Sequence, residues 1–500
     1  MSSRISFAAQ EPRLLKAARM VVKGLPGGCR AMLVGGFVRD CLLGIASKDA
    51  DLETYGIEAE VLETVLKELF DDKIETVGRS FGIYKIFLGD GFDLDVAIPR
   101  RESKSGSGHT GFEVEGDPEL DPKEAARRRD FTINAIAADP KTGELFDPFN
   151  GQDDIKDRIL RVVDGSTFVD DPLRVYRGVQ FTARFGLRVE PSTLELMRLM
   201  VARGELDTLS KERVTDELKK LLLKAPKPSV GFELMRTLGL IRRDYPELHA
   251  LIDTPQEPEW HPEGDVWIHT MMVIDEAAGI VSQNSKRKSQ NFTEEERLQV
   301  MMGALCHDLG KPSTTAPGEK DGVPRVRSIG HEEAGVTPTE ALFDRFAFGE
   351  SVRQASIASA KDHLKPGMLW RQLEKGTLTE EAYVNAVRKL IKRTKPTSWR
   401  VLLAISEADH FGRGLPDIKH EPYAVGETFA RMVEEHRLDG EGIKPLLLGR
   451  DLQALGMKPG PLMGRLLKEI ERLRDEGKIK TKKDALAYVN RFTFTSNPFE

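Results

Sequence analysis

Apolar residues follow two different spacings in the first part of the chain. At residues 11–23 and 58–70 they recur every three or four positions, which is typical of an amphipathic helix. Shorter apolar runs at residues 74–77, 83–88 and 92–98 have the length and composition of strands. The pattern predicts a small sheet with helices packed against it.

Helical spacing predominates beyond residue 190, as in the long amphipathic segment LSKERVTDELKKLLL. A polar, proline-rich segment at residues 254–265 interrupts it and is typical of a domain boundary. We therefore predict an α+β chain in which a small mixed β-sheet head precedes mostly α-helical parts. The predicted bounds are 1–150 for the head, 151–253 for a helical neck and body, 254–415 for a further helical domain and 416–500 for a helical tail.

Composition narrows the class of protein. A length of 500 residues exceeds one ordinary core, and 40% apolar with 31% charged residues is typical of a globular protein in water. Cys29, Cys41 and Cys306 have neither metal-ligand nor disulfide spacing, which fits a reducing compartment. No apolar run is long enough to span a bilayer. We expect a cytoplasmic protein without membrane contact.

The net charge of −6 argues against a protein that coats nucleic acid indiscriminately. Basic clusters nevertheless occur at residues 127–129, at residues 219–227 and at residues 478–483. Each cluster taken alone is more typical of a solvated surface than of a phosphate contact. Charge therefore permits a local nucleic-acid surface without requiring one.

The richest motif is LVGGFVRDCLLGIASKDADLETYG, residues 33–56, which predicts a strand, a Gly-Gly turn, a short helix and a second strand. Asp49 and Asp51 are two apart on that second strand, so both carboxylates point to one face. Paired carboxylates suit the Mg²⁺ ions that bind a triphosphate. Gly35 and Gly36 let backbone N–H groups approach phosphate, and Arg39 follows in the helix. The alternative is a hairpin with a surface Asp-x-Asp.

This motif resembles the nucleotidyltransferase family of class II CCA-adding enzymes and bacterial poly(A) polymerases. The resemblance implies a small mixed-sheet catalytic head in which Asp49 and Asp51 hold Mg²⁺. Asp95, in the strand FDLDVAI, is the candidate for a third catalytic carboxylate beside them. The alternative for Asp95 is a solvated residue on an edge strand.

Two segments follow the predicted strands of the head. Residues 99–124 have the Gly, Ser and charge content of a mobile loop, and the resemblance implies that this loop helps to switch from C to A addition. RRRDFTINAIA follows, and by resemblance Arg129, Asp130 and Asn134 contact the incoming nucleotide. By composition alone this segment is a basic start to an amphipathic helix.

FVDDPLRVYRG then predicts a helix capped by Asp171, with Pro172 at its first position. Asp171, Arg174 and Arg177 are three apart and share one helical face. A carboxylate accepts from the exocyclic amine of cytosine or adenine while a guanidinium donates to the ring nitrogen, so this pair suits CTP and ATP but not UTP or GTP. The alternative is an ordinary ion pair on a helix surface.

Two residues depart from the usual pattern of the family around this template. Asp170 shortens the first carboxylate, where the family usually has Glu, and Gln180 stands where a third arginine is common. The base-reading pair itself is intact.

A second candidate site comprises His269, His307 and Asp308 in CHDLGK, His331, His363 and Asp409. This series resembles the HD phosphohydrolase superfamily, in which histidines and aspartates from several helices bind divalent metal. The resemblance implies an HD domain over residues 254–415, a transition metal such as Mn²⁺, Ni²⁺ or Co²⁺, and phosphatase and 2′,3′-cyclic phosphodiesterase activity. His331 and His363 would permit a second metal. The alternative is a relic helical domain retained for packing.

The tail, residues 446–489, resembles the C-terminal segment with which many CCA-adding enzymes hold the tRNA elbow. Its Lys458, Arg465, Lys478 and Lys480 offer charge to phosphate, and a plain helical hairpin is the alternative.

The whole chain thus predicts a tRNA nucleotidyltransferase that binds tRNA, CTP and ATP and adds the 3′-terminal CCA. A poly(A) polymerase or an A-only adding enzyme shares every head motif. A strongly basic C-terminal extension would favour the poly(A) polymerase. An RNA-binding HD phosphohydrolase is the alternative from another class. Both Asp49 and Asp51 are present, which disfavours a head that merely binds RNA.

Overall fold

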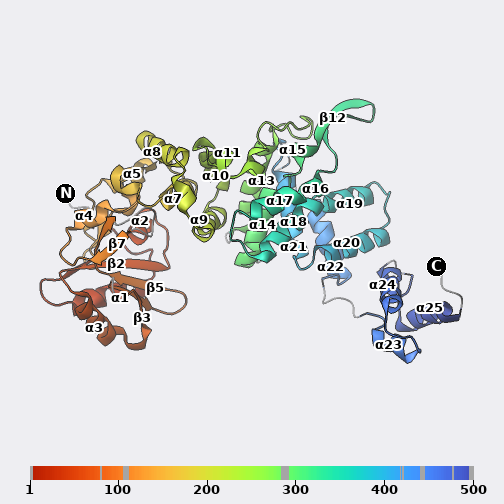
Figure 1. Ribbon diagram of the computed structural model, residues 1–500, viewed down its shortest axis with the longest axis horizontal. Helices are drawn as coiled ribbons and strands as arrows, with labels where there is room; N and C mark the ends of the chain where they lie inside the picture. The colour runs from red at the N-terminus through yellow and green to blue at the C-terminus, as the bar shows by residue number, and fades with distance from the viewer. Residues whose placement is uncertain are drawn as a thin grey trace. The chain divides into compact units, whose positions relative to one another are not determined.

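The computed structural model describes residues 4–78, 82–104, 112–282, 292–416, 418, 422–439, 445–475 and 478–494. The chain divides into two compact units, Met1–Pro246 and Glu247–Glu500 (Figure 1). The boundary lies seven residues before the predicted end of the neck and body at residue 253, and the finer division stays a prediction. Within the described ranges, none of the helices is both long enough and apolar enough to cross a membrane.

The first unit is built on a seven-stranded sheet with the order β3-β4-β5-β2-β1-β8-β9. The sheet is mixed, because β2 and β5 run parallel whereas the other pairs are antiparallel. The strands are β1 Arg30–Val34, β2 Asp49–Tyr55, β3 Ile74–Gly78, β4 Ile83–Phe87, β5 Asp93–Ala97, β8 Ala137–Ala138 and β9 Leu145–Phe146. The predicted mixed α+β fold with a small sheet in the head is confirmed.

Helices cover this sheet as the apolar spacing predicts. The apolar faces of α1 and α3 are buried, and α1 packs on β1, β2 and β5. The helices of this unit are α1 Pro12–Gly24, α2 Gly36–Leu42, α3 Ala59–Phe70, α4 Pro122–Arg127, α5 Gly151–Asp157, α6 Gly165–Phe168, α7 Leu173–Phe185, α8 Pro191–Ala202, α9 Lys211–Lys224, α10 Pro228–Thr237 and α11 Leu240–Asp244. α7 packs against both α9 and α10, so the helical neck has α7 at its centre.

The predicted loop at residues 99–124 differs from the structure. β6 Arg100–Lys104 pairs antiparallel with β7 Phe112–Gly116, and α4 follows. The part of that loop at residues 105–111 lies outside the described residues. Polar composition favoured a loop, but backbone pairing between the two strands outweighs it. A short parallel pair, β10 Ile159–Leu160 with β11 Arg188–Val189, lies outside the main sheet.

The second unit is helical apart from one antiparallel hairpin, β12 Thr315–Lys320 with β13 Val323–Ser328. α14 packs against α13, α18 and α21, and this packing buries nearly every side chain in the second half of α14. Asp265 caps α13, and a capping box between Thr293 and Glu296 begins α14, so both starts are fixed by local polar contacts.

The helices around this core are α12 Pro246–His249, α13 Val266–Val281, α14 Glu294–Cys306, α15 Lys311–Thr314, α16 His331–Ala334, α17 Val336–Phe343, α18 Glu350–Asp362, α19 Lys365–Glu374, α20 Glu380–Thr394, α21 Trp399–Phe411 and α22 Ala424–Glu435. The predicted tail contains α23 Gly449–Ala454, α24 Pro461–Asp475 and α25 Lys482–Phe494. These last three helices share an apolar cluster of their own, which includes Leu452, Leu466 and Val489.

Candidate functional site

The turn between β1 and α2 brings backbone close to charged side chains. Gly35 has φ +67°, a conformation that favours glycine. A Cβ there would lie 2.7 Å from Nη1 of Arg129 and 3.3 Å from Oδ2 of Asp51. The missing side chain therefore leaves room for a cation and a carboxylate to meet at the end of the strand.

Three predicted carboxylates gather beside this turn. Asp49 and Asp51 are both exposed on one face of β2, and the parallel register pairs Asp51 with Asp95 of β5. Asp95 Oδ1 forms an ion pair with Nζ of Lys85 at 2.9 Å. The side chain of Asp51 faces the open cavity. Even so, desolvation by the surrounding protein, opposed by the charge of Arg129, raises the pKa of Asp51 to about 6. The carboxylates of Asp95 and Asp49 add to the increase.

Sequence reasoning missed Glu53, which continues the same face of β2 two positions after Asp51. Its Oε1 lies 3.8 Å from Nη2 of Arg129, and its Oε2 accepts a hydrogen bond from the Tyr55 hydroxyl at 2.6 Å. Because side chains on one face of a strand recur every second residue, the position of Asp49 and Asp51 was enough to predict that Glu53 shares their face. Glu53 holds Arg129 close to the carboxylate pair.

Asp130 and Asn134 are buried below the cavity and are linked to α7. Asp130 Oδ1 accepts from Nδ2 of Asn134 at 2.8 Å, and its Oδ2 accepts from Nε of Arg177 at 2.7 Å. Burial alone would raise the pKa of Asp130, but Arg177 and the Asn134 hydrogen bond outweigh it, so the pKa is lowered. Asp130 is thus a buried anion that ties the head to the neck.

The position of Arg39 in the first turn of α2 predicts a phosphate contact, and in the structure its guanidinium has several partners within the protein. Its guanidinium donates to Asp40 Oδ1 at 2.6 Å and 2.9 Å and to Asn134 Oδ1 at 2.6 Å. It also lies over the rings of Phe181 and Phe185 of α7, with its Cζ 5.1 Å and 4.6 Å from their centroids. Arg39 still lines the cavity, but most of its donors hold the wall together.

The predicted base-reading residues lie at the start of α7, which begins at Leu173, with Pro172 at the N-cap. The expected proline at the first helical position is therefore wrong by one residue, and Asp171 Oδ1 instead accepts from the Leu173 backbone at 3.2 Å. Arg174 donates to the carbonyls of Thr167 and Arg128 at 2.8 Å and 2.7 Å. Asp171 and Arg174 are therefore held by separate partners.

The partner of Asp171 is Arg213 of α9, whose Nη2 lies 3.1 Å from both carboxylate oxygens. Sequence reasoning missed Arg213 because 42 residues separate the two along the chain. The basic character of α9 was visible in the sequence, but not which of its cations turns inward.

One cavity of about 760 Å³ collects all of these groups except Asp95 and Glu53. Its lining includes Gly35, Gly36, Arg39, Asp49, Asp51, Arg129, Asp130, Asn134, Asp171, Arg174, Arg177, Gln180, Arg184, Arg213, Lys220 and Lys224. The size suits a nucleotide, and the cations suit its phosphates. Carboxylates lie on the β2 side, and the predicted base-reading residues Asp171 and Arg174 lie just before α7 and in its first turn.

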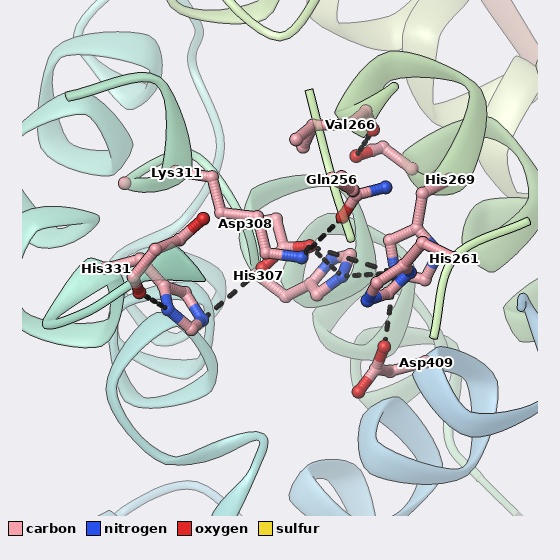
Figure 2. A network of polar contacts seen from close by, with 12 residues as sticks. Gln256, His261, Val266, His269, His307, Asp308, Lys311, His331 and Asp409 are labelled. Carbon is pink, nitrogen blue, oxygen red and sulfur yellow. Dashed lines mark hydrogen bonds and ion pairs between the residues drawn. The ribbon is translucent and has the colours of Figure 1, made fainter. Parts of the chain in front are cut away.

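In the second unit the other predicted metal ligands converge around Asp308. Figure 2 labels all of them except His363. His307 and Asp308 follow the last residue of α14, where the helix ends, so adjacent side chains can both turn inward. Asp308 Oδ2 lies 3.2 Å from Nε2 of His307 and 3.7 Å from Nε2 of His269. Its Oδ1 lies 3.5 Å from Nε2 of His331 and 3.9 Å from Nε2 of His363.

Asp409 of α21 completes the cluster, with its Oδ1 3.1 Å from Nε2 of His269. Asp308 therefore lies between two groups of possible ligands, one with His269 and His307 and the other with His331 and His363. This arrangement fits two metal ions that share one carboxylate.

The second ring nitrogen of each histidine is held by the protein. Nδ1 of His307, His331 and His363 donates to the carbonyls of Ala304, Ser328 and Ser359, at 2.7, 2.8 and 3.0 Å. A carbonyl can only accept, so these contacts fix the tautomer and leave each Nε2 lone pair facing Asp308. Such outer contacts are what metal-binding histidines require.

His269 Nδ1 instead contacts Glu263 Oε1 at 2.8 Å, and the same oxygen lies 2.9 Å from Nδ1 of His261. Sequence reasoning missed Glu263 and His261, although both stand in the proline-rich segment before α13. The side chains of Asp409 and Glu263 outweigh burial and raise the pKa of His269.

The cluster fits a divalent cation. Nε2 of His331 and Oδ1 of Asp308 are buried and have no hydrogen-bond partner among the described residues. Burial would raise the pKa of Asp308, but His307 and Lys311 hold it well below its usual range. Burial, with His307, lowers the pKa of His363 to about 4, so its imidazole is neutral near pH 7. Imidazole nitrogens and carboxylate oxygens together form the mixed N and O donor set of transition metals.

Three family models match the chain. "Poly A polymerase head domain" matches residues 31–161, "Probable RNA and SrmB- binding site of polymerase A" matches residues 186–252, and "HD domain" matches residues 266–388. The first model covers the carboxylate strands and the third covers all of the metal-ligand candidates except Asp409.

Relatives with similar sequences are described as multifunctional CCA proteins. The protein of Xanthomonas oryzae pv. oryzae is 36% identical over 442 residues, which span 87% of this chain and 95% of that protein. The solved structure "CCA-adding enzyme apo form I" has a TM-score of 0.60 at 21% identity and covers 98% of this chain and 97% of its own. The Thermotoga maritima CCA-adding enzyme complexed with tRNA has a TM-score of 0.55 at 20% identity, with 97% and 96% covered. These two structures share the fold.

The metal cluster of the second unit leads to a prediction about binding. The wild-type protein should bind one more equivalent of Mn²⁺ per chain than His331→Ala, because His331 belongs to only one of the two ligand groups. Stoichiometry is measured by elemental analysis after gel filtration. His436→Ala, an exposed histidine outside the cluster, is the control and should bind as the wild type does. Equal stoichiometry in wild type and His331→Ala would contradict the two-metal arrangement.

Proposed function

The chain belongs to the family of multifunctional CCA proteins, and from this premise we propose that it builds or repairs the 3′-terminal CCA of tRNA with CTP and ATP. The observation that carries the proposal is the single head cavity, which contains Asp49 and Asp51 together with Asp171 and Arg174. Chemistry on a phosphate and recognition of a base can therefore act on one nucleotide.

The proposed reaction is attack by the 3′-hydroxyl of tRNA on the α-phosphate of the nucleotide, with pyrophosphate as the leaving group. Both domain types of this chain use divalent metals in general, and we propose Mg²⁺ in the head, held by Asp49 and Asp51. When bound, Mg²⁺ neutralises phosphate charge and makes the hydroxyl a better nucleophile. Asp95, next to Asp51 in the sheet, adds a third carboxylate to the same edge.

The residues of this chain position the nucleotide around that chemistry. Gly35 and Gly36 let backbone approach the phosphates, and Arg129, held by Glu53, offers its guanidinium to them. Asp171 accepts from the exocyclic amine of C or A, and Arg174 donates to the ring nitrogen. The carbonyls of Thr167 and Arg128 anchor the Arg174 side chain at the wall of the same cavity.

A direct experiment tests the proposal against a poly(A) polymerase or an A-only adding enzyme. The protein is incubated with tRNA that ends before CCA, with each nucleoside triphosphate alone and with all four together, and the 3′ ends are sequenced. CCA on most ends supports the proposal. Addition of A alone, or of a long A tract, supports one of the alternatives.

We predict that Asp49→Ala and Asp51→Ala each abolish nucleotide transfer, because either change removes a carboxylate from the metal pair. Transfer is measured with labelled CTP. Hydrolysis by the HD site should persist in both variants, since that site lies in the other unit. Transfer near the wild-type rate in either variant would contradict the assignment.

A second prediction concerns the residue that holds the base-reading carboxylate. Arg213→Ala should relax discrimination against UTP by roughly tenfold, since Asp171 loses charge-assisted hydrogen bonds that fix its orientation. Arg213→Lys should restore part of it. Misincorporation of U is measured by sequencing the tRNA ends.

The matched control is Arg198→Ala, which removes an arginine paired with Glu195 on the neighbouring α8, outside the cavity. A lower overall rate with unchanged base choice in Arg213→Ala would show that the contact supports only the fold.

A second activity is favoured by the buried cluster around Asp308. We propose that the HD domain is a metal-dependent phosphohydrolase for 2′- and 2′,3′-cyclic phosphates, with Mn²⁺, Ni²⁺ or Co²⁺ on His269, His307, Asp308 and Asp409, and a further ion on His331 and His363. The free cysteines Cys29, Cys41 and Cys306 fit a reducing compartment, so we place both activities in the cytoplasm.

Hydrolysis of a 2′,3′-cyclic nucleotide should be lost in His307→Ala and in Asp308→Ala, whereas CCA addition should survive both changes. Release of the monoester is followed by chromatography in the presence of each of the three metals and Mg²⁺. No hydrolysis by the wild type with any metal would leave the domain as a packing relic.

A further inference from the structure

The HD cluster forms one side of a cavity of about 450 Å³ that extends beyond the metal-ligand candidates. Asp308 and Asp409 lie on its metal side, and Arg371 and Arg413 also line it. Ile329 and Met368, which are 68% and 38% exposed, add apolar surface at the rim. The volume exceeds what a single phosphate needs and suits a nucleotide.

Arg413 has donors that the protein does not satisfy. Its Nε is buried without a hydrogen-bond partner among the described residues, and its Nη2 lies 3.9 Å from Asp409 Oδ2, too far for a hydrogen bond. The other oxygen of Asp409, Oδ1, faces His269 at 3.1 Å. Arg413 therefore approaches the oxygen of Asp409 that is turned away from His269.

Arg371 of α19 is the second such cation. Within the part of the chain that the structure describes, no hydrogen bond or ion pair holds its guanidinium. It lies at the exposed rim, yet partial burial and then the charge of Arg413 lower its pKa. Two neighbouring guanidiniums that repel each other are stabilised by an anion that accepts from both.

The other lysines and arginines around this cavity, Lys311, Lys320 and Arg327, are already engaged. Nη1 of Arg327 donates to the carbonyl of Glu319 at 3.2 Å. Lys311 lies 2.6 Å from Asp308 Oδ2 and donates to Gln256 at 2.7 Å. Lys320 of the β12–β13 hairpin lies over the Trp260 ring, with its Nζ 4.5 Å from the centroid. Arg371 and Arg413 are therefore the pair best placed to receive an anion.

Resting on the phosphohydrolase activity proposed above, we propose that Arg371 and Arg413 bind a second phosphate of the substrate, which is not hydrolysed. The substrate class is then a nucleotide or RNA 3′ end with a 5′-phosphate or phosphodiester in addition to its 2′,3′-cyclic phosphate. Water attacks the cyclic phosphorus, one ring P–O bond breaks, and the freed ribose oxygen takes a proton. The second phosphate stays unchanged, and Ile329 and Met368 give the base an apolar surface.

The test compares kcat/KM for cytidine 2′,3′-cyclic phosphate with that for its 5′-phosphorylated form. In the wild type the 5′-phosphate should raise kcat/KM roughly tenfold or more, as expected for charge-assisted hydrogen bonds. Arg371→Ala and Arg413→Ala should bring the ratio of the two values to about one. Arg371→Lys should keep part of the preference. The control is Arg353→Ala, whose arginine pairs with Asp344 and does not line the cavity, and it should keep the full ratio.

A binding measurement on chelator-treated protein gives a readout independent of hydrolysis. Calorimetry should show that Arg371→Ala weakens the binding of cytidine 3′,5′-bisphosphate more than the binding of cytidine 3′-monophosphate. Comparing variant with wild type cancels any binding of these probes in the head. Equal weakening of both probes, or of neither, would overturn the second-phosphate subsite.

The outcomes separate the two proposals. If the wild type hydrolyses both cyclic substrates with equal kcat/KM, the subsite is wrong and the phosphohydrolase stands. If it hydrolyses neither, the phosphohydrolase is wrong. If Arg371→Ala lowers kcat/KM equally for both substrates, the arginines act on the hydrolysed phosphate or on the fold, and the subsite is wrong.

Discussion

The buried ion pair between Asp130 and Arg177 is the contact on which the head cavity depends. Asp130 follows the basic segment of the head, whereas Arg177 belongs to α7 in the neck, and 2.7 Å separates their atoms. Removing one partner of such a pair leaves an uncompensated buried charge, so the two parts stay together. The same α7 carries Arg174 and is preceded by Asp171. The ion pair therefore helps to fix Asp171 and Arg174 relative to the head residues that line the same cavity.

Several arginines around that pair contact other residues of the cavity wall. Arg39 reaches from α2 to Asn134, which in turn donates to Asp130. The guanidiniums of Arg39 and Arg177 lie over the ring of Phe181. Those of Arg39 and Arg184 lie over the ring of Phe185. A sequence shows how many cations a segment has, but not which ones are used up within the wall of a cavity.

Local periodicity predicted the strands and the common face of Asp49 and Asp51, because both depend on residues close together in sequence. The pairing of Asp51 with Asp95 depends on a parallel register between strands far apart, so only the resemblance suggested it. Arg213 was missed for the same reason, because 42 residues separate it from Asp171. Glu263 stands only six residues before His269, but it lies in the irregular segment before α13, where no periodicity predicts which side chains meet. The β6–β7 pair was missed because polar residues with a loop composition can still form a ladder when their backbones align.

The negative charge of the carboxylates is balanced differently at the two sites. In the head, carboxylates crowd together with Arg129 as the nearby cation, and Asp51 carries a raised pKa. A divalent cation bound there would relieve that crowding. Around Asp308, four imidazoles are already oriented by Glu263 and three carbonyls, and the donor set is complete without substrate. The head therefore presents crowded carboxylates at an open cavity, whereas the HD cluster presents imidazoles that the protein already orients.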